Sequence, residues 1–146
     1  MEVEFRRLTA TDVAKVHEIE KAVFPAEAWS EHLIREELTS RWGYYIGAFM
    51  GERLIGYGGI KGSHEGDLMT LAVRSDYRRL GLGRQIVELL LEQARAVGIG
   101  ELFLEVRVSN DPARALYQAL GFAPVGLIAN YYRDPVEDAV AMRIEL

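Results

Sequence analysis

The chain has 146 residues, of which 49% are hydrophobic and 27% charged, the balance of a globular protein rather than of a disordered one. A chain of this length buries a core without covalent staples, so we expect a single domain over residues 1–146. It has no cysteine, which excludes disulfides, thiolate metal sites and a cysteine nucleophile. Its net charge of −5 argues against nucleic acid as a direct partner.

The sequence also lacks the patterns of membrane-bound and exported proteins. Its apolar runs stay shorter than the roughly 18 residues that cross a bilayer. Charged residues stand at the N-terminus, at Glu2, Glu4, Arg6 and Arg7, where a signal peptide would begin. We therefore expect a cytoplasmic protein with no membrane partner.

The first part of the chain predicts short helices and strands. Val3 and Phe5 alternate with charged residues, as in a strand. Thr9 indicates a helix start and Pro25 its end, and Ser30 is typical of the cap of a second helix. The expected elements are a strand at 3–8, helices at about 9–24 and 30–40, and a hairpin of strands 44–50 and 54–60. Glycines at 56, 58 and 59 indicate a bulge or a close backbone approach in the last strand.

The second part predicts a βαβ unit and a closing hairpin. A strand at 67–74 leads into a helix at 82–97, whose apolar stripe is Leu82, Ile86, Leu89, Leu90 and Val97. The remaining expected elements are a strand at 102–108, a helix from Ser109–Pro112 to Leu120, and strands at 123–131 and 138–146. This order predicts an α/β (α+β) fold, with a mixed, mostly antiparallel sheet and helices on both faces.

An anion site is expected between the strand at 67–74 and the helix at 82–97. The N–H groups at a helix N-terminus have no intrahelical partner, and the positive end of the dipole lies there. Gly81 and Gly83 lack a Cβ, so a phosphate can approach the backbone. Arg78, Arg79 and Arg84 can pair with that phosphate. The alternative is a helix start that needs glycine for packing, with arginines that are merely solvated.

The spacing of the glycines selects among phosphate-binding motifs. Ile86 stands where a dinucleotide fingerprint needs its third glycine, and the chain has no P-loop sequence. Residues 78–83 fit R-x-x-G-x-G, which resembles the loop with which the GNAT superfamily of N-acetyltransferases holds the diphosphate of acetyl-CoA. The resemblance spans nearly the whole chain, includes its order of elements, and is densest over 68–132.

The resemblance implies a set of cofactor contacts and no metal. Acetyl-CoA would be the co-substrate, with its pantetheine arm paired to the backbone of one strand as an added strand would be. The implied cofactor-binding residues are Leu71, Ala72, Val73, Arg78, Arg79, Leu80, Gly81, Leu82, Gly83, Arg84 and Asn110. Asn110 has an equally good interpretation as a plain helix cap. The His64–Asp67 cluster is not expected to hold a metal ion.

Two residues stand out as candidates for the chemistry. Glu105 lies in the middle of an apolar strand, where a carboxylate must be paired, for instance with Arg107, or must face a cleft. Tyr117 lies on the following helix, and its alternative role is that of a core aromatic. The segments at 105–110 and 115–122 resemble the bacterial RimI-type branch, which acetylates the N-terminal alanine of ribosomal small-subunit protein eighteen. That resemblance implies Glu105 as general base and Tyr117 as general acid.

Glu105 and Tyr117 suit the direct transfer of an acetyl group from a thioester to an amine. A protein α-amine has a pKa of about 7.7–8.0, so much of it is protonated at neutral pH and a base must take a proton. The leaving thiolate needs a proton, which a phenol can donate. Direct attack requires no covalent acyl-enzyme, which agrees with the absence of cysteine. The three histidines, His17, His32 and His64, carry no recognisable catalytic motif.

Three aromatic residues are candidates for the acceptor side. Trp29, Tyr131 and Tyr132 resemble residues that border the peptide entrance in the RimI branch, or are ordinary core aromatics. The spacer at 26–28 is slightly longer than in that branch. The expected function is acetylation of a protein N-terminal α-amine, with a basic ribosomal protein as partner. Open alternatives are other N-termini, lysine or a small amine as acceptor, and a non-catalytic acyl-CoA-binding module.

Overall fold

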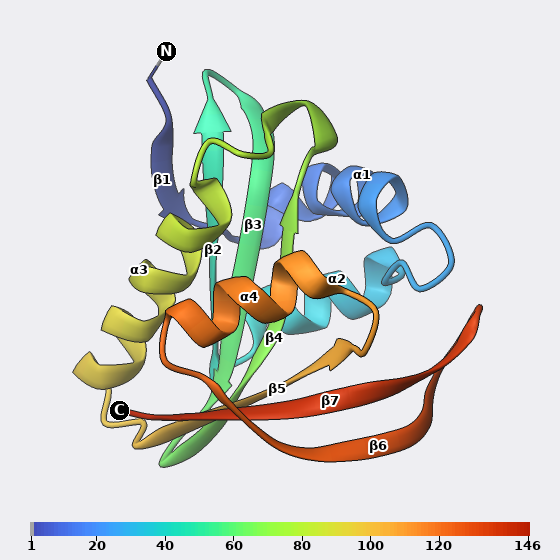
Figure 1. The fold of residues 1–146 in the computed structure, drawn as a ribbon. Helices are drawn as coiled ribbons and strands as arrows, with labels where there is room; N and C mark the ends of the chain where they lie inside the picture. Colours follow the sequence, from blue (N-terminus) through green and yellow to red (C-terminus); the bar gives the residue numbers. More distant parts are fainter. Residues whose placement is uncertain (1) are drawn as a thin grey trace.

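The computed structural model describes residues 2–146, which form one seven-stranded sheet covered by helices (Figure 1). The strands are β1 (Glu4–Arg7), β2 (Gly43–Met50), β3 (Arg53–Gly62), β4 (Glu65–Val73), β5 (Glu101–Arg107), β6 (Ala123–Arg133) and β7 (Val136–Glu145). The α-helices are α1 (Val13–Val23), α2 (Glu31–Thr39), α3 (Leu82–Ala96) and α4 (Asp111–Ala119). Two short 3-10 helices, Ala10–Asp12 and Ser75–Tyr77, precede α1 and α3.

The sheet has the order β1-β2-β3-β4-β5-β7-β6 and changes character at its centre. All neighbouring strands run antiparallel except β4 and β5, which run parallel. This parallel pair is short, since Glu65–Asp67 is aligned with Glu101–Phe103 and the pairing stops there. Beyond Asp67 the two strands diverge, so β4 from residue 68 onward has a strand neighbour only on its β3 side. The divergence leaves an opening in the middle of the sheet.

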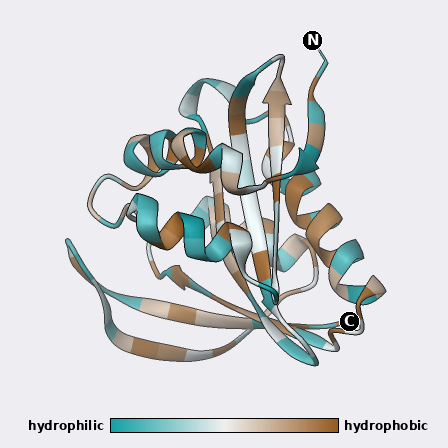
Figure 2. Cartoon of the chain, turned by 180° about the vertical axis from the view of Figure 1, so that it is seen from behind, coloured by the Kyte–Doolittle hydropathy of each residue, from teal (hydrophilic) through white to brown (hydrophobic). Residues whose placement is uncertain are grey.

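The helices lie on both faces of the sheet (Figure 1). Val16 and Ile19 of α1 and Ile34 of α2 pack with Tyr45 and Tyr57 in one buried cluster. A second, larger cluster lies on the other face and joins α3 and α4 to the sheet through Ile86, Leu90, Leu104, Tyr117 and Met142. Hydrophobic and hydrophilic stretches alternate along α3, as expected for a helix buried on one side (Figure 2). The predicted α/β fold with helices on both faces is confirmed.

One expected apolar stripe is wrong in part. Leu89 and Val97 are 37% and 57% exposed, whereas Leu82, Ile86 and Leu90 are buried as expected. Val97 lies after the last residue of α3, at its C-cap, so it no longer follows the helical face. Leu89 borders a groove at the edge of the sheet instead of the core. The buried face of α3 is completed by Val87, Leu91 and Ala94.

The glycines of β3 mark both an irregular register and close packing. The pairing of β3 with β4 shifts between Gly59 and Ile60, which confirms the expected bulge. A Cβ on Gly59 would lie 2.1 Å from the ring of Tyr45. The close approach at Gly59 is therefore made by an aromatic side chain, whereas at Gly56 and Gly58 the backbone of β4 also comes close.

Candidate active site

The opening between β4 and β5 holds a cavity of about 530 Å³, here called the Tyr117 cavity. Leu71 of β4, Glu105 of β5 and Tyr117 of α4 line it, together with Arg78 and Asn110. These residues are far apart in the chain and meet because the strands separate. On the side of the opening β4 has no strand neighbour beyond Asp67, so the N–H and C=O groups that point to this side, apart from the Val73 carbonyl, remain available to an extended ligand.

The glycine loop ends at the N-terminus of α3. Gly81, the N-cap, has a φ of +77°, a conformation that favours glycine, and no side chain caps the helix. The first intrahelical hydrogen bond runs from the Gln85 N–H to the Gly81 carbonyl at 3.1 Å. The N–H groups of residues 82–84 therefore have no partner inside the helix, which makes this end suited to an anion.

Gly83 has a different role from Gly81. A Cβ on Gly83 would lie 3.6 Å from side-chain atoms of both Leu71 and Leu116, an ordinary contact. An alanine would fit there, whereas a branched side chain would occupy space between α3, β4 and α4. The two glycines thus matter for different reasons, one for its backbone conformation and the other for the space beside it.

The three arginines of the loop are placed differently. Arg78 donates from Nε to the Val73 carbonyl at 3.2 Å and lines the Tyr117 cavity. Arg79 adopts a positive φ of 66°, which is strained for a residue with a Cβ. Arg84 lies 3.6 Å from Glu88 one turn along the helix. The side chain of Leu80 is 55% exposed, whereas those of Ala72 and Leu82 are buried in the core and cannot contact a ligand.

Glu105 is an exposed carboxylate on β5 that faces the opening. Its Oε1 accepts a hydrogen bond from the Tyr131 hydroxyl at 3.2 Å. Arg107, two residues on, pairs instead with Glu27 at 2.6 Å and with Glu137 at 3.1 Å. The considered pairing of Glu105 with Arg107 is therefore wrong, and one oxygen of Glu105 remains available to a proton donor in the cleft.

Tyr117 is buried, with its ring set edge-on to Phe122 at 5.7 Å between centroids. It is a core aromatic that also borders the cavity lined by Glu105. Burial and, to a smaller extent, the neighbouring Tyr132 raise the pKa of Tyr117 well above the ordinary value for a phenol. The phenol consequently keeps its proton through the neutral and mildly alkaline range.

A second cavity of about 530 Å³, the Trp29 cavity, adjoins the first. Trp29, Tyr131, Tyr132 and Arg133 line it, so the predicted acceptor-side aromatics lie together. Trp29 also packs edge-on against Tyr45 at 6.4 Å, which anchors it to the core. Both cavities are lined by one common wall, formed by Phe24, Ala26, Glu27, Leu68, Met69, Thr70, Glu105 and Tyr132.

Sequence reasoning missed a buried carboxylate beneath the Trp29 cavity. Glu20 is 1% exposed and accepts hydrogen bonds from the Trp29 N–H at 3.0 Å and from the Tyr57 hydroxyl at 2.6 Å. Burial raises its pKa above the ordinary value. Its position gave a signal, because Glu20 follows Val16 and Ile19 on the core-facing side of α1. A carboxylate on such a face needs buried donors, and here they fix the α1–α2 loop.

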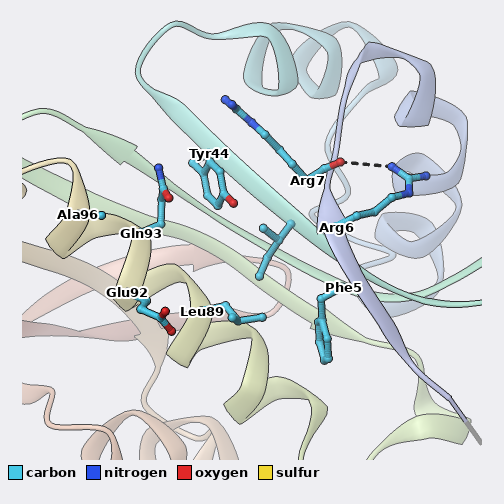
Figure 3. Close-up of a pocket in the computed structure, with 9 residues that line it drawn as sticks. Phe5, Arg6, Arg7, Tyr44, Leu89, Glu92, Gln93 and Ala96 are labelled. Atoms are coloured by element: carbon cyan, nitrogen blue, oxygen red, sulfur yellow. Dashed lines mark hydrogen bonds between the residues drawn. The ribbon is translucent and has the colours of Figure 1, made fainter.

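Another cavity, of about 320 Å³, lies between β1, β2 and α3 (Figure 3). Arg6, Arg7, Tyr44, Leu89 and Gln93 are among its lining residues, and none of the predicted site residues lies there. Arg6 is already paired with Asp12 at 2.9 Å. Within residues 2–146, no group of three His, Asp or Glu side chains is placed to hold a metal ion. No helix in that same range is long and apolar enough to cross a membrane.

Comparisons with known proteins agree with this geometry. Residues 13–122 match the model of the acetyltransferase (GNAT) family. The chain is 37% identical over 142 residues to the N-alpha-acetyltransferase RimI of Mycobacterium tuberculosis, covering 93% of this chain and 88% of the relative. It is 43% identical over 84 residues to the ribosomal protein bS18-alanine N-acetyltransferase of Escherichia coli, covering 56% of this chain and 57% of that protein.

Structural similarity extends over nearly all of the chain. The crystal structure of the ribosomal-protein-S18-alanine N-acetyltransferase from Escherichia coli superposes with a TM-score of 0.90 at 31% identity. The alignment covers 99% of this chain and 94% of the Escherichia coli chain. Sequence and fold lead to the same conclusion: this chain is a member of the GNAT family of acetyltransferases.

Proposed function

We propose that this protein acetylates the N-terminal α-amine of a protein, and that its acceptor is the N-terminal alanine of ribosomal protein bS18. The observation that carries the proposal is the position of Glu105 in the wall common to the two cavities. A base at that position can meet an amine that enters from the Trp29 cavity. Tyr117 borders only the other cavity, where the leaving group would lie. Relatives of this chain carry the proposed activity in their names.

As a GNAT acetyltransferase, the protein uses acetyl-CoA as its acetyl donor. The residues present fit this molecule. The side of β4 that faces the opening can pair with the extended pantetheine arm, and the uncapped start of α3 with Arg78 suits the diphosphate. When bound, the cofactor supplies an activated thioester carbonyl. Asn110 lies where it can contact the cofactor while its Oδ1 also accepts the Ala113 N–H at 3.3 Å.

The residues of the site divide the proton transfers between them. Glu105 takes a proton from the acceptor amine as nitrogen attacks the thioester carbonyl, directly or through a water molecule. A C–N bond forms, the C–S bond breaks, and Tyr117 gives its phenolic proton to the departing sulfur. The Tyr131 hydroxyl holds one oxygen of Glu105 and so orients the carboxylate toward the cleft. No covalent acyl-enzyme is needed, consistent with a chain that has no cysteine.

The proposal is tested by following thiol release from acetyl-CoA with a disulfide reagent. One peptide begins with a free alanine followed by basic residues, and the other is N-terminally blocked and carries internal lysines. We expect turnover of the first peptide alone, strongly reduced near neutral pH by Glu105→Gln. Turnover of the blocked peptide would overturn the α-amine assignment in favour of lysine. If neither peptide reacts while acetyl-CoA still binds, the acceptor is not a protein amine of either kind, or the protein is a binding module.

A further inference from the structure

Arg107 is the most heavily connected side chain at the edge of the cleft. It is the last residue of β5 and lies on the same face of the strand as Glu105, two residues before it. Its guanidinium pairs with Glu27 at 2.6 Å and with Glu137 at 3.1 Å. It also donates to the Pro135 carbonyl at 3.0 Å, and it lies 4.2 Å from the centre of the Tyr132 ring.

These contacts join segments that are distant in the chain. Glu27 belongs to the loop between α1 and α2, whereas Pro135 and Glu137 belong to the β6–β7 hairpin. Glu27 lies 80 residues from Arg107, and Glu137 lies 30 residues from it. Among residues 2–146 no ion pair joins the loop to the hairpin directly. Among the ion pairs of the described residues, those of Arg107 alone connect the two segments.

The surroundings of Arg107 favour a fixed orientation of its side chain. The Arg107 side chain is 19% exposed, which shields its contacts from water more than at an open surface. Glu137 also accepts the Ser109 N–H at 2.7 Å, and Ser109, followed by Arg107, holds the pKa of Glu137 below its ordinary value. A planar guanidinium can donate in several directions at once, which a lysine ammonium on a flexible stem does less well.

The two joined segments are walls of the acceptor side. Glu27 lines both cavities, Tyr132 lines both, and Pro135 lines the Tyr117 cavity. The distance between the α1–α2 loop and the hairpin thus sets the width of the passage toward Glu105. Glu27 is the residue of this loop that Arg107 holds.

We propose that Arg107 is a positioning residue that fixes the acceptor entrance by tying the α1–α2 loop to the β6–β7 hairpin. The inference rests on the proposed function, because it assigns the acceptor to the Trp29 cavity. Arg107 takes no part in proton transfer, since its charge is already satisfied by two carboxylates. Loss of the tie lets both walls move and weakens acceptor binding, while the cofactor contacts on β4 and α3 stay in place.

The test compares steady-state kinetics of four variants of the full chain with the free-alanine peptide. Arg107→Met should raise the KM for the peptide about tenfold, with the KM for acetyl-CoA and kcat changing less than about twofold. Glu27→Gln should raise the peptide KM by about threefold, and Arg107→Lys should fall between wild type and Arg107→Met. Arg143→Met is the matched control, since Arg143 is also a strand arginine paired with two carboxylates, Glu101 and Glu145, and lies outside both cavities. It should leave the peptide KM unchanged.

Two outcomes would overturn the proposal. An unchanged peptide KM in Arg107→Met is one, and an equal rise in both KM values is the other, because it would indicate a general loss of structure. Glu27→Gln keeps the proposal falsifiable if Arg107→Met fails to fold.

A second measurement tests the role of Arg107 even if the proposed function is wrong. If wild-type protein acetylates neither peptide, amide hydrogen exchange still tests the tie. Exchange at residues 24–29 and 134–137 should speed up in Glu27→Gln and Arg107→Met and stay unchanged in Arg143→Met. Unchanged exchange in all variants would refute the role of Arg107 whatever the acceptor is.

Discussion

On the proposed cofactor side of the cleft the expected contacts come from the main chain of β4 and of the start of α3, whereas on the proposed acceptor side they come from side chains of the α1–α2 loop and of β6. The cofactor side consists of the side of β4 that faces the opening and the uncapped start of α3. The proposed acceptor side consists of Trp29, which Glu20 holds, of Tyr132, which Arg107 contacts, and of Tyr131. A surface of backbone groups tolerates many side chains, while a surface of side chains changes with each substitution. The comparison suggests one cofactor and an acceptor preference that is easily altered.

The largest effect is expected from Glu105→Gln, which tests whether catalysis can be lost while cofactor binding is kept. Glu105 lines both cavities, but its proposed role is to accept a proton. Glu105→Gln should lower kcat by about 10²-fold or more and leave the Kd for acetyl-CoA nearly unchanged. The loss should shrink as pH rises past the α-amine pKa of about 8, because free amine accumulates without a base. Steady-state rates from pH 6 to 9.5 and calorimetric titration measure both quantities. An unchanged rate near pH 7 would remove Glu105 from the mechanism.

Gly83 tests the cofactor side alone. A valine there would extend from the Cβ position toward Leu71 and Leu116, into the space beside the start of α3. Gly83→Val should weaken acetyl-CoA binding by about tenfold or more, with little change in the peptide KM at saturating cofactor. Gly83→Ala is the control, since a Cβ meets only ordinary contacts at 3.6 Å. If Gly83→Val binds acetyl-CoA as wild type does, the loop is not part of the cofactor site.

The same contrast explains what could be predicted from the sequence. The strands, the helices and the glycine loop follow from local periodicity and turn chemistry, and they emerge within a few residues of their expected bounds. The acceptor side depends on pairs such as Arg107 with Glu27, 80 residues apart, which no local pattern reveals. The buried Glu20 was visible only as a polar residue on an apolar helix face. Likewise, the three-residue pairing of β4 with β5, which opens the cleft, depends on the whole sheet.

The Tyr117→Phe variant separates the proposed catalytic role of Tyr117 from its role in packing. Tyr117→Phe keeps the ring against Phe122 and removes only the hydroxyl, so the melting temperature should change little. We expect kcat to fall by about tenfold through loss of the proton donor. Burial raises the pKa of Tyr117, so its proton is retained where a free phenol, at about 10, would lose it. The wild-type rate should therefore rise with the free amine and show no alkaline decline up to about pH 10. A decline near pH 9 that Tyr117→Phe lacks would show that the phenol ionises earlier than its burial implies.

The smallest effect is expected from substitutions of Asn110, which decide whether this residue is only a helix cap or also a cofactor contact. Its Oδ1 caps α4 by accepting the Ala113 N–H, and the residue also lines the Tyr117 cavity. Asn110→Ala should lower the free energy of unfolding by about 1 kcal/mol through loss of the cap. Asn110→Ser can still cap the helix but has no amide N–H₂ group, so its stability should stay close to wild type. If Asn110→Ser nevertheless weakens acetyl-CoA binding severalfold, the amide contacts the cofactor. If its affinity equals that of wild type, Asn110 belongs to the fold, and the cofactor side at this point depends on the main chain alone.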